Sequence, residues 1–343
     1  MRMGFQINDI RDLDCEVLVV CSTYNHEKYL SDALDGFVSQ KTSFPFLVLV
    51  HDDASTDRTA DVIRDYESRF PNIIKGIYEE DNQYQQGLFF WYLEYLRNSK
   101  ARYIALCEGD DYWASPDKLE MQYEALEKDG FLSYCFTNAV KMDANTRKTL
   151  GKMLPAFPSE ERILSKRVLG AEDLLRLAFI PTASFFSRKD AWLSQPVLPK
   201  EAFQGDRAHQ IYLSLSGDAL YLDEVTSVYR VNNGGSLVGS WVSSNQKYLE
   251  ILNSYIELYK CFDRDSNGAF HDEVQDAIDV VVYDEMLISG DKTALPPRKA
   301  MAVANRRGLG EKCKYLLFRV SPKLYLSVRK WGKRFLGKVS ANG

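Results

Sequence analysis

Three carboxylates stand close together at Glu108, Asp110 and Asp111, directly after the apolar run of residues 102–107. Carboxylate oxygens suit Mg²⁺ or Mn²⁺, and such an ion offsets the negative charge that grows on a departing diphosphate. The position of these acids therefore indicates a divalent-cation site for a nucleotide diphosphate. Neighbouring acids in a turn can also cap the following helix, so this motif alone leaves both interpretations open.

A second acidic pair, Asp52 and Asp53, follows the apolar run of residues 46–50. A carboxylate at this position can accept a hydrogen bond from a nucleotide base or from ribose hydroxyls. An Asx-turn that leads into a helix explains Asp53 and Ser55 equally well, and we expect Asp57 to stabilise the start of that helix. Asp52 is therefore the stronger candidate for nucleotide binding.

These acids need a scaffold, and the sequence predicts one in which strands and helices alternate. Apolar runs that predict buried strands are residues 15–21, 46–50, 73–79, 102–107 and 132–140. Helical spacing of apolar residues separates several of them, so the strands are expected to be parallel. Ligands of open α/β sheets bind beyond the carboxyl ends of the strands, where the loops 22–25, 51–57 and 108–113 would converge.

The second half of the chain is predicted in less detail. Residues 141–172 read as a mobile loop or connection, residues 207–216 as a helix and residues 221–231 as a strand. Two long helical patterns follow, at about 243–262 and 270–288. We predict an α/β catalytic domain over residues 1–240 and a helical C-terminal region over residues 241–343.

The bulk composition is that of a globular protein, with 343 residues, 45% hydrophobic residues and a net charge of −5. No run approaches the roughly 18 consecutive apolar residues of a membrane-spanning helix, and residues 1–14 lack the apolar core of a signal peptide. We therefore expect a cytoplasmic protein. The six cysteines lie far apart without a CxxC pair, which predicts reduced, structural thiols and no zinc.

Five ordered segments within residues 14–240 resemble the bacterial family 2 glycosyltransferases: STYNHEKYL, LVLVHDDASTD, YIALCEGDDYW, GDRAHQIYL and DEVTSVYRVNNGGS. The resemblance implies the GT-A fold, a Rossmann-like and mostly parallel central sheet flanked by helices. It also implies a nucleotide-sugar donor, a divalent metal, Mn²⁺ or Mg²⁺, and inversion at the anomeric carbon.

The resemblance also assigns residues. The nucleotide pocket would contain Thr23, Tyr24, Asn25, Glu27 and Asp52. Glu108 and Asp110 would occupy the positions of the DxD motif, with Asp110 as the main metal ligand and Asp111 beside it. The glutamate at the first position departs from the family pattern, which puts its own contact with ribose or metal in doubt.

Asp206 would be the general base, a role that the chemistry also motivates. Inversion needs a carboxylate that takes the proton of the attacking hydroxyl while the diphosphate leaves from the opposite side. Capping of the following helix is the alternative for Asp206. Arg230 would reach the diphosphate or form a surface ion pair, and Asn232 stands where the family often has histidine.

The C-terminal tail differs from the rest of the chain. Residues 312–343 hold nine Lys or Arg and no Asp or Glu, interleaved with aliphatic and aromatic residues. Such a segment can lie on an anionic membrane, so we predict a peripheral protein on the inner face of the cell membrane. Packing on the acidic body of the protein and nonspecific attraction to nucleic acid are the alternatives, and no nucleic-acid partner is expected.

Together these features predict an inverting glycosyltransferase. The donor would be a UDP-sugar and the acceptor a glycan or a lipid-linked sugar, in bacterial surface polysaccharide synthesis. A sugar nucleotidyltransferase is one alternative, but it should carry a Gly-rich, basic loop after the first strand, which STYNHEKYL is not. A catalytically inactive nucleotide-sugar-binding scaffold is the other.

Overall fold

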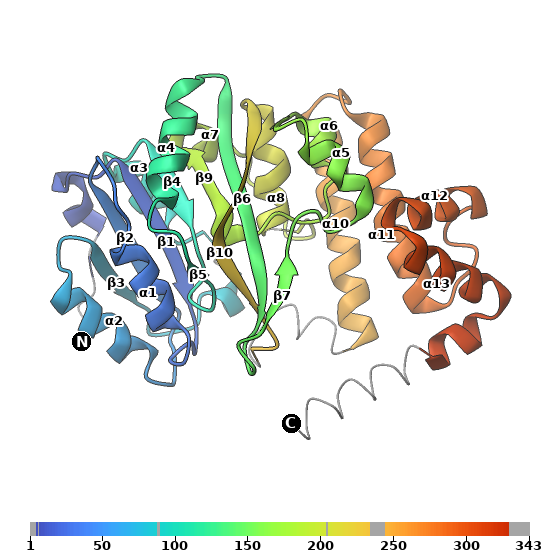
Figure 1. Ribbon diagram of the computed structural model, residues 1–343, viewed down its shortest axis with the longest axis horizontal. Coiled ribbons are helices and arrows are strands. Elements are labelled where there is room, and N and C mark those ends of the chain that lie inside the picture. The colour runs from blue at the N-terminus through green and yellow to red at the C-terminus, as the bar shows by residue number, and fades with distance from the viewer. Residues whose placement is uncertain (1–4, 6, 88–89, 204, 234–243, 329–343) are drawn as a thin grey trace.

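The computed structural model describes residues 5, 7–87, 90–203, 205–233 and 244–328. Ten strands of these residues form one mixed sheet (Figure 1). They are β1 (Val17–Thr23), β2 (Phe46–Asp52), β3 (Ile74–Tyr78), β4 (Tyr103–Leu106), β5 (Tyr112–Trp113), β6 (Leu132–Asp143), β7 (Thr149–Lys152), β8 (Val168–Leu169), β9 (Phe185–Arg188) and β10 (Asp218–Val231). The spatial order is β3-β2-β1-β4-β9-β6-β10-β5, with β7 paired to β6 and β8 paired to β10.

The long strands of this sheet share one direction. β3, β2, β1 and β4 pair in parallel, and β6 pairs in parallel with β10. β9 is inserted between β4 and β6 and is antiparallel to both, while β5, β7 and β8 add short antiparallel pairs. The predicted, mostly parallel sheet is confirmed.

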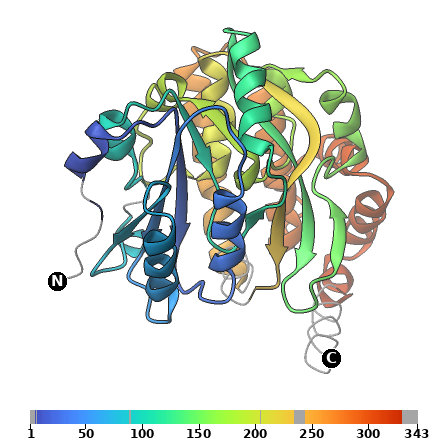
Figure 2. The ribbon, with the colours of Figure 1, turned by 60° about the vertical axis from the view of Figure 1, so that its left-hand side comes forward.

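Helices cover both faces of the sheet. They are α1 (Leu30–Val38), α2 (Thr59–Arg69), α3 (Leu93–Asn98), α4 (Lys118–Lys128), α5 (Glu161–Leu164), α6 (Ala171–Leu174), α7 (Lys189–Leu193), α8 (Asp206–Tyr212), α10 (Asn245–Asp265), α11 (His271–Ser289), α12 (Pro297–Arg307) and α13 (Leu309–Val320). α1 and α2 lie side by side on one face with α4, and bury residues such as Leu34 and Ile63 (Figure 2). α3 and α7 cover the other face with Leu96 and Trp192.

Helix α1 shows how local sequence positions the acidic loop. Leu30, Leu34 and Phe37 recur at helical spacing and are fully buried. A Cβ on Gly36 would lie 2.6 Å from the carbonyl oxygen of Trp113, so only glycine allows α1 to approach β5 this closely. The strand that follows the acidic residues is therefore held against α1.

The C-terminal helices pack on the α/β part of the chain, beside β6 and β10 (Figure 1). Leu258 and Phe262 of α10 share a core with Ile211 of α8. Arg207 Nε donates a hydrogen bond to the Tyr259 hydroxyl at 3.0 Å, which ties the same two helices together. The predicted helical C-terminal region is present, and within the described ranges every helix is too short or too polar to span a membrane.

Residues 141–172 hold more regular structure than the predicted connection. β6 continues to Asp143 and returns as β7, and Asp143 Oδ1 accepts hydrogen bonds from the backbone of Asn145 and Thr146 in the turn. The prediction was wrong here because β7 is exposed along its length and carries no apolar pattern. The domain boundary near residue 240 falls outside the described residues and stays a prediction.

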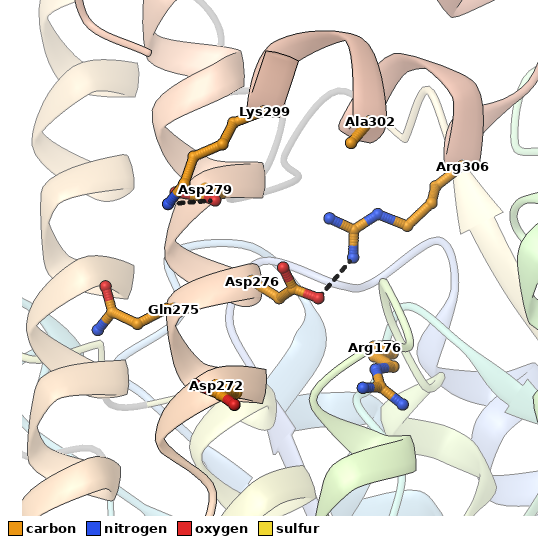
Figure 3. A pocket seen from close by; sticks show the side chains of 8 residues that line it. All are labelled: Arg176, Asp272, Gln275, Asp276, Asp279, Lys299, Ala302 and Arg306. Carbon is orange, nitrogen blue, oxygen red and sulfur yellow. Dashed lines mark hydrogen bonds and ion pairs between the residues drawn. The ribbon is translucent and has the colours of Figure 1, made fainter. Parts of the chain in front are cut away.

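A cleft of about 310 Å³ lies between α11, α12 and Arg176 (Figure 3). The ion pairs of its basic side chains are Arg306 to Asp276 (3.2 Å), Lys299 to Asp279 (2.9 Å) and Arg176 to Glu273 (3.1 Å). These charges offset one another, and Glu108, Asp110 and Asp206 do not line the cleft. We interpret it as a structural seam between the C-terminal helices and the segment that follows α6.

Candidate active site

Three loops leave the sheet at the same edge, as predicted. Thr23 and Asp52, the last residues of β1 and β2, are direct partners in the parallel register. The Asp53 N–H donates to Thr23 O at 3.0 Å, and the Gly109 N–H donates to Ser22 O at 2.9 Å. The loop after β1 is therefore bonded to the loops after β2 and β4, which brings the predicted nucleotide and cation residues together.

The side chains of Asn25 and Glu27 hold two of these loops to each other. Asn25 Oδ1 accepts from Thr56 N at 2.8 Å, and Glu27 Oε2 accepts from Arg58 N at 3.1 Å. The Glu27 N–H donates in return to Asp57 Oδ2 at 3.1 Å. Asn25 and Glu27 thus shape the wall of the predicted nucleotide pocket, and direct contact with a nucleotide stays a prediction.

Asp52 and Thr23 present polar atoms that are not satisfied within the described structure. Asp52 is fully buried, and its Oδ1 accepts from Ser55 N at 3.1 Å, whereas its Oδ2 has no hydrogen-bond partner. The buried hydroxyl of Thr23 also lacks a partner. Unpaired buried polar atoms are costly, so they mark where a ligand or water completes the structure. Tyr24 is 40% exposed and is free to lie against a ligand.

The acidic loop after β4 faces the start of α8. Burial raises the pKa of Glu108 well above its usual value, and the charges of Asp206, Asp111 and Asp110 raise it further. Burial also raises the pKa of Asp111, and Asp110 adds to this effect. Four carboxylates from two distant segments of the chain therefore lie near one another, in surroundings that disfavour so much negative charge.

Arg230 fastens this loop to β10. Its guanidinium donates to Asp110 O at 2.7 Å and to the carboxylate of Asp32, while its N–H donates to Asp111 Oδ1 at 2.7 Å. Arg230 is only 4% exposed and lies over the ring of Tyr112 at 4.6 Å. The Arg230 side of this ion pair is buried, whereas the Asp32 side chain is 37% exposed, and the predicted contact of Arg230 with the diphosphate stays a prediction.

Asp206 is the first residue of α8, and Gly205 is the N-cap. The Asp206 carboxylate accepts a hydrogen bond from the Thr182 hydroxyl. Burial raises the pKa of Asp206, and the hydrogen bond from Thr182 partly opposes this shift. The side-chain hydrogen bond to this carboxylate thus comes from Thr182, outside α8, which favours a role other than capping.

Sequence reasoning missed Thr182 and Asn233. Asn233 Nδ2 donates to Asp110 Oδ2 at 2.7 Å, whereas Asn232 Nδ2 donates to Asp143 Oδ2 at the same distance, at the β6–β7 turn. The pair of asparagines after β10 was the one available signal for Asn233. Nothing in the sequence around Thr182 pointed to Asp206.

The geometry places a polar pocket, an acidic loop and the half-buried carboxylate of Asp206 at the carboxyl edge of one sheet, and a family comparison accounts for that arrangement. The family model described as Glycosyl transferase family 2 matches residues 18–192. The chain belongs to this family.

Relatives of this glycosyltransferase agree with the assignment. An uncharacterized protein of Mycobacterium tuberculosis is 33% identical over 215 residues, which cover 62% of this chain and 58% of that protein. A Bacillus subtilis glycosyltransferase named for teichuronic acid biosynthesis, TuaG, is 24% identical over 68% of this chain and 85% of its own length. This chain thus spans less than two thirds of the mycobacterial relative.

A solved glycosyltransferase shares the fold. The mannosyltransferase PcManGT from Pyrobaculum calidifontis, in complex with GDP-Man and Mn²⁺, has a TM-score of 0.55 at 16% identity. The match covers 94% of this chain and 84% of that structure. The predicted GT-A fold is confirmed, and the chain is a glycosyltransferase by family. Asp206 and Arg230 lie beyond the residues that the family model matches.

The acidic loop of this glycosyltransferase fits a divalent cation that is shared with a ligand. Among the described residues, no group of three or more His, Cys, Asp or Glu side chains is arranged to hold a metal by itself. Mg²⁺ bound to nucleotides commonly takes one or two carboxylates and completes its shell with phosphate oxygens and water. The excess of carboxylates around Glu108 suits such a site, and the role of Asp110 as the main metal ligand stays a prediction. Asp111 already accepts from Arg230 N, and its role as a ligand stays a prediction.

Proposed function

We propose that this protein is an inverting glycosyltransferase that moves a sugar from a UDP-sugar to a glycan or lipid-linked acceptor in bacterial surface polysaccharide synthesis. The observation that carries the proposal is the half-buried carboxylate of Asp206 at the start of α8, which is near enough to the acidic loop for its charge to raise the pKa of Glu108. A base and a cation site that flank one space are what a single displacement at a sugar carbon requires.

In the proposed reaction, Asp206 takes the proton of the acceptor hydroxyl. The acceptor oxygen forms a bond to the anomeric carbon while the bond from that carbon to the diphosphate oxygen breaks. The electron pair of the broken bond leaves with the nucleotide diphosphate. Attack and departure on opposite sides of the carbon invert its configuration, and Asp206 must be ionised at the start.

The remaining residues would bind and orient the donor. Asp52 Oδ2 would accept a hydrogen bond from the base or ribose, and Thr23 and Tyr24 would line the same pocket. A divalent cation, held by Asp110 and Glu108 when bound, would offset the charge of the leaving diphosphate.

The relatives support the class of acceptor, and the solved structures bind donors with two different bases. The relative named for teichuronic acid biosynthesis is consistent with assembly of a surface polysaccharide. PcManGT binds GDP-Man, and a TarS structure of Staphylococcus aureus with a TM-score of 0.50 contains UDP-GlcNAc. The family favours glycosyl transfer over nucleotidyl transfer, and an inactive scaffold would not need a base beside the cation site.

We expect a UDP-sugar with Mn²⁺ or Mg²⁺ to raise Tm of the full chain, because a ligand that binds only the folded state stabilises it by mass action. At a ligand concentration of about 100 times Kd the gain is roughly 2.7 kcal/mol. The measurement is thermal unfolding with UDP-, GDP- and dTDP-sugars, each with either metal or with EDTA, together with release of the nucleotide diphosphate.

Each possible result of these measurements supports or contradicts a specific part of the proposed function. Stabilisation by guanosine donors alone would replace the proposed base. Equal stabilisation with metal and with EDTA would contradict the cation site, and no response to any donor would contradict donor binding altogether.

The described part of the tail supports membrane association. Residues 309–328 expose several large apolar side chains: Leu309, Leu316, Val320, Leu324 and Val328. Basic residues alternate with them: Lys312, Lys314, Arg319 and Lys323. Apolar contact combined with charge attraction is how peripheral helices bind anionic lipid, and a lipid-linked acceptor would be presented there. Residues 329–343 of the predicted segment lie outside the described residues.

The chain is expected to sediment with vesicles of phosphatidylcholine and phosphatidylglycerol, and to remain in the supernatant with phosphatidylcholine alone. Binding should weaken at high salt because screening shortens the reach of the basic residues. L316E/V320E should reduce binding strongly, whereas L150E, at an exposed leucine of β7, should not. Equal loss in both variants would show that the apolar face of α13 is not the membrane contact.

A further inference from the structure

Thr182 makes a contact with Asp206 that the reaction described above does not use. The Thr182 hydroxyl donates a hydrogen bond to Asp206 Oδ2. Thr182 is only 8% exposed, so this bond lies in surroundings from which water is largely excluded. A hydrogen bond donated to a carboxylate stabilises its ionised form, and the effect is larger when little water competes.

The backbone around Thr182 is held from several sides. Thr182 begins the short 3-10 helix η4 (Thr182–Ser184), in which the Ser184 N–H and hydroxyl both donate to Pro181 O. The indole of Trp113 donates to Ala183 O at 2.9 Å. Gln122 Nε2 of α4 donates to Ser184 O at 2.8 Å. Thr182 therefore has little freedom to turn away from Asp206.

Trp113 connects this anchor to the acidic loop. It lies in β5, two residues after Asp111, and its ring packs against Phe37 of α1 at 4.8 Å. Because Trp113 also bonds to Ala183, the residue next to Thr182, the acidic loop and the Asp206 contact are fixed relative to one another. The proposed base and the proposed cation ligands are thus positioned through one chain of contacts.

The electrostatic surroundings of Asp206 make such a contact important. Groups on the neighbouring elements whose pKa values are raised by the charge of Asp206 are Glu108, Asp111, Tyr84, Tyr92, Tyr229 and Tyr255. The two carboxylates among them disfavour a further negative charge when they are ionised, whereas the tyrosines are uncharged at neutral pH. Burial pushes the pKa of Asp206 in the same direction, and the Thr182 hydrogen bond opposes it.

We propose that Thr182 is a positioning residue for Asp206: its hydroxyl holds one carboxylate oxygen, favours the ionised form of the group and leaves the other oxygen for the acceptor proton. The importance of this contact for catalysis rests on the proposed function, in which Asp206 is the base. The state of Asp206 itself can be tested without any substrate.

The test compares wild type, D206N, T182V and T182V/D206N by the free energy of unfolding of the full chain between pH 4 and 9. A raised folded pKa destabilises the wild type relative to D206N as the pH rises through the window between the unfolded and folded values, and the difference levels off above the folded value. For T182V compared with T182V/D206N, the difference in the free energy of unfolding is expected to level off about one pH unit higher. This is the size of effect expected for a hydrogen bond to a carboxylate. T182S should return the levelling-off to the wild-type position.

Thr137 provides the matched control. It is fully buried in β6 and its hydroxyl pairs with that of Thr226 at 2.6 Å, so T137V should lower stability without moving the titration. An unchanged titration in T182V, or a T182S variant that behaves as T182V does, would overturn the proposal. Transfer or donor hydrolysis that survives in D206N would instead contradict the role of Asp206 as the base. The conclusion about the Thr182 hydrogen bond would still rest on the unfolding measurements alone.

Discussion

Replacing Asp206 with asparagine is expected to lower kcat by about 100- to 10,000-fold, the usual contribution of a positioned general base. Asparagine keeps the shape of the side chain and can still accept from Thr182, but it cannot take the proton of the acceptor. Kd for the donor should change little, since the proposed donor pocket lies at the loops after β1, β2 and β4, which pair side by side in the sheet. Steady-state transfer and donor titration with D206N measure both quantities.

The control for D206N is a buried aspartate that lies away from Asp206 and the acidic loop. Asp173 of α6 is 3% exposed and pairs with Lys166 at 2.7 Å, so D173N should lower stability and leave kcat nearly unchanged. A D206N variant with normal kcat would remove Asp206 from the chemistry. Loss of donor binding in D206N would show that the carboxylate acts on the donor side.

The surroundings of Asp206 determine the direction in which the rate of transfer should depend on pH. Burial raises the pKa of Asp206, so the ionised base is lost at a higher pH than for an exposed aspartate. Transfer should therefore fall on acidification before ordinary surface carboxylates titrate. In the T182V variant, transfer should be lost at a still higher pH on acidification, because no Thr182 hydroxyl favours the ionised carboxylate.

The sequence predicted the strands that carry the site because these strands are buried on both faces. Val17–Thr23 and Phe46–Asp52 are almost entirely buried, and central parallel strands of this kind read as continuous apolar runs. Their polar ends then identify the ligand-binding edge without further information. The exposed strand β7 exists through its pairing with β6, and its own residues gave no signal.

The contacts that shape the site could not be predicted because they join distant residues. Arg230 and Asp32 are 198 residues apart, and Asn233 and Asp110 are 123 residues apart. The family resemblance identified Arg230 and Asp110, but spacing along the chain reports only local geometry and did not identify their partners. Both partners matter for function, since they determine how Asp110 is held.

The second large effect is expected at Asp110. D110N removes one negative charge from the proposed cation site, and should weaken metal-dependent donor binding and transfer on the order of 100-fold, because a bound cation supplies several kcal/mol of charge stabilisation. Asn233 can still donate to the oxygen of the new amide, so the fold of the loop should be retained. Donor titration with Mn²⁺ and with EDTA, for wild type and D110N, separates metal-dependent from metal-independent binding.

D117N is the matched control for D110N, since Asp117 is an exposed carboxylate just before α4 and seven residues further along the chain. It should leave Kd in Mn²⁺ unchanged. If D110N reduces binding equally in Mn²⁺ and in EDTA, Asp110 contacts the donor directly and does not act through a cation. If D110N instead strengthens binding in EDTA while it abolishes the gain from Mn²⁺, repulsion between Asp110 and the diphosphate is what the cation relieves, and the charge crowding around Glu108 has a direct functional reason.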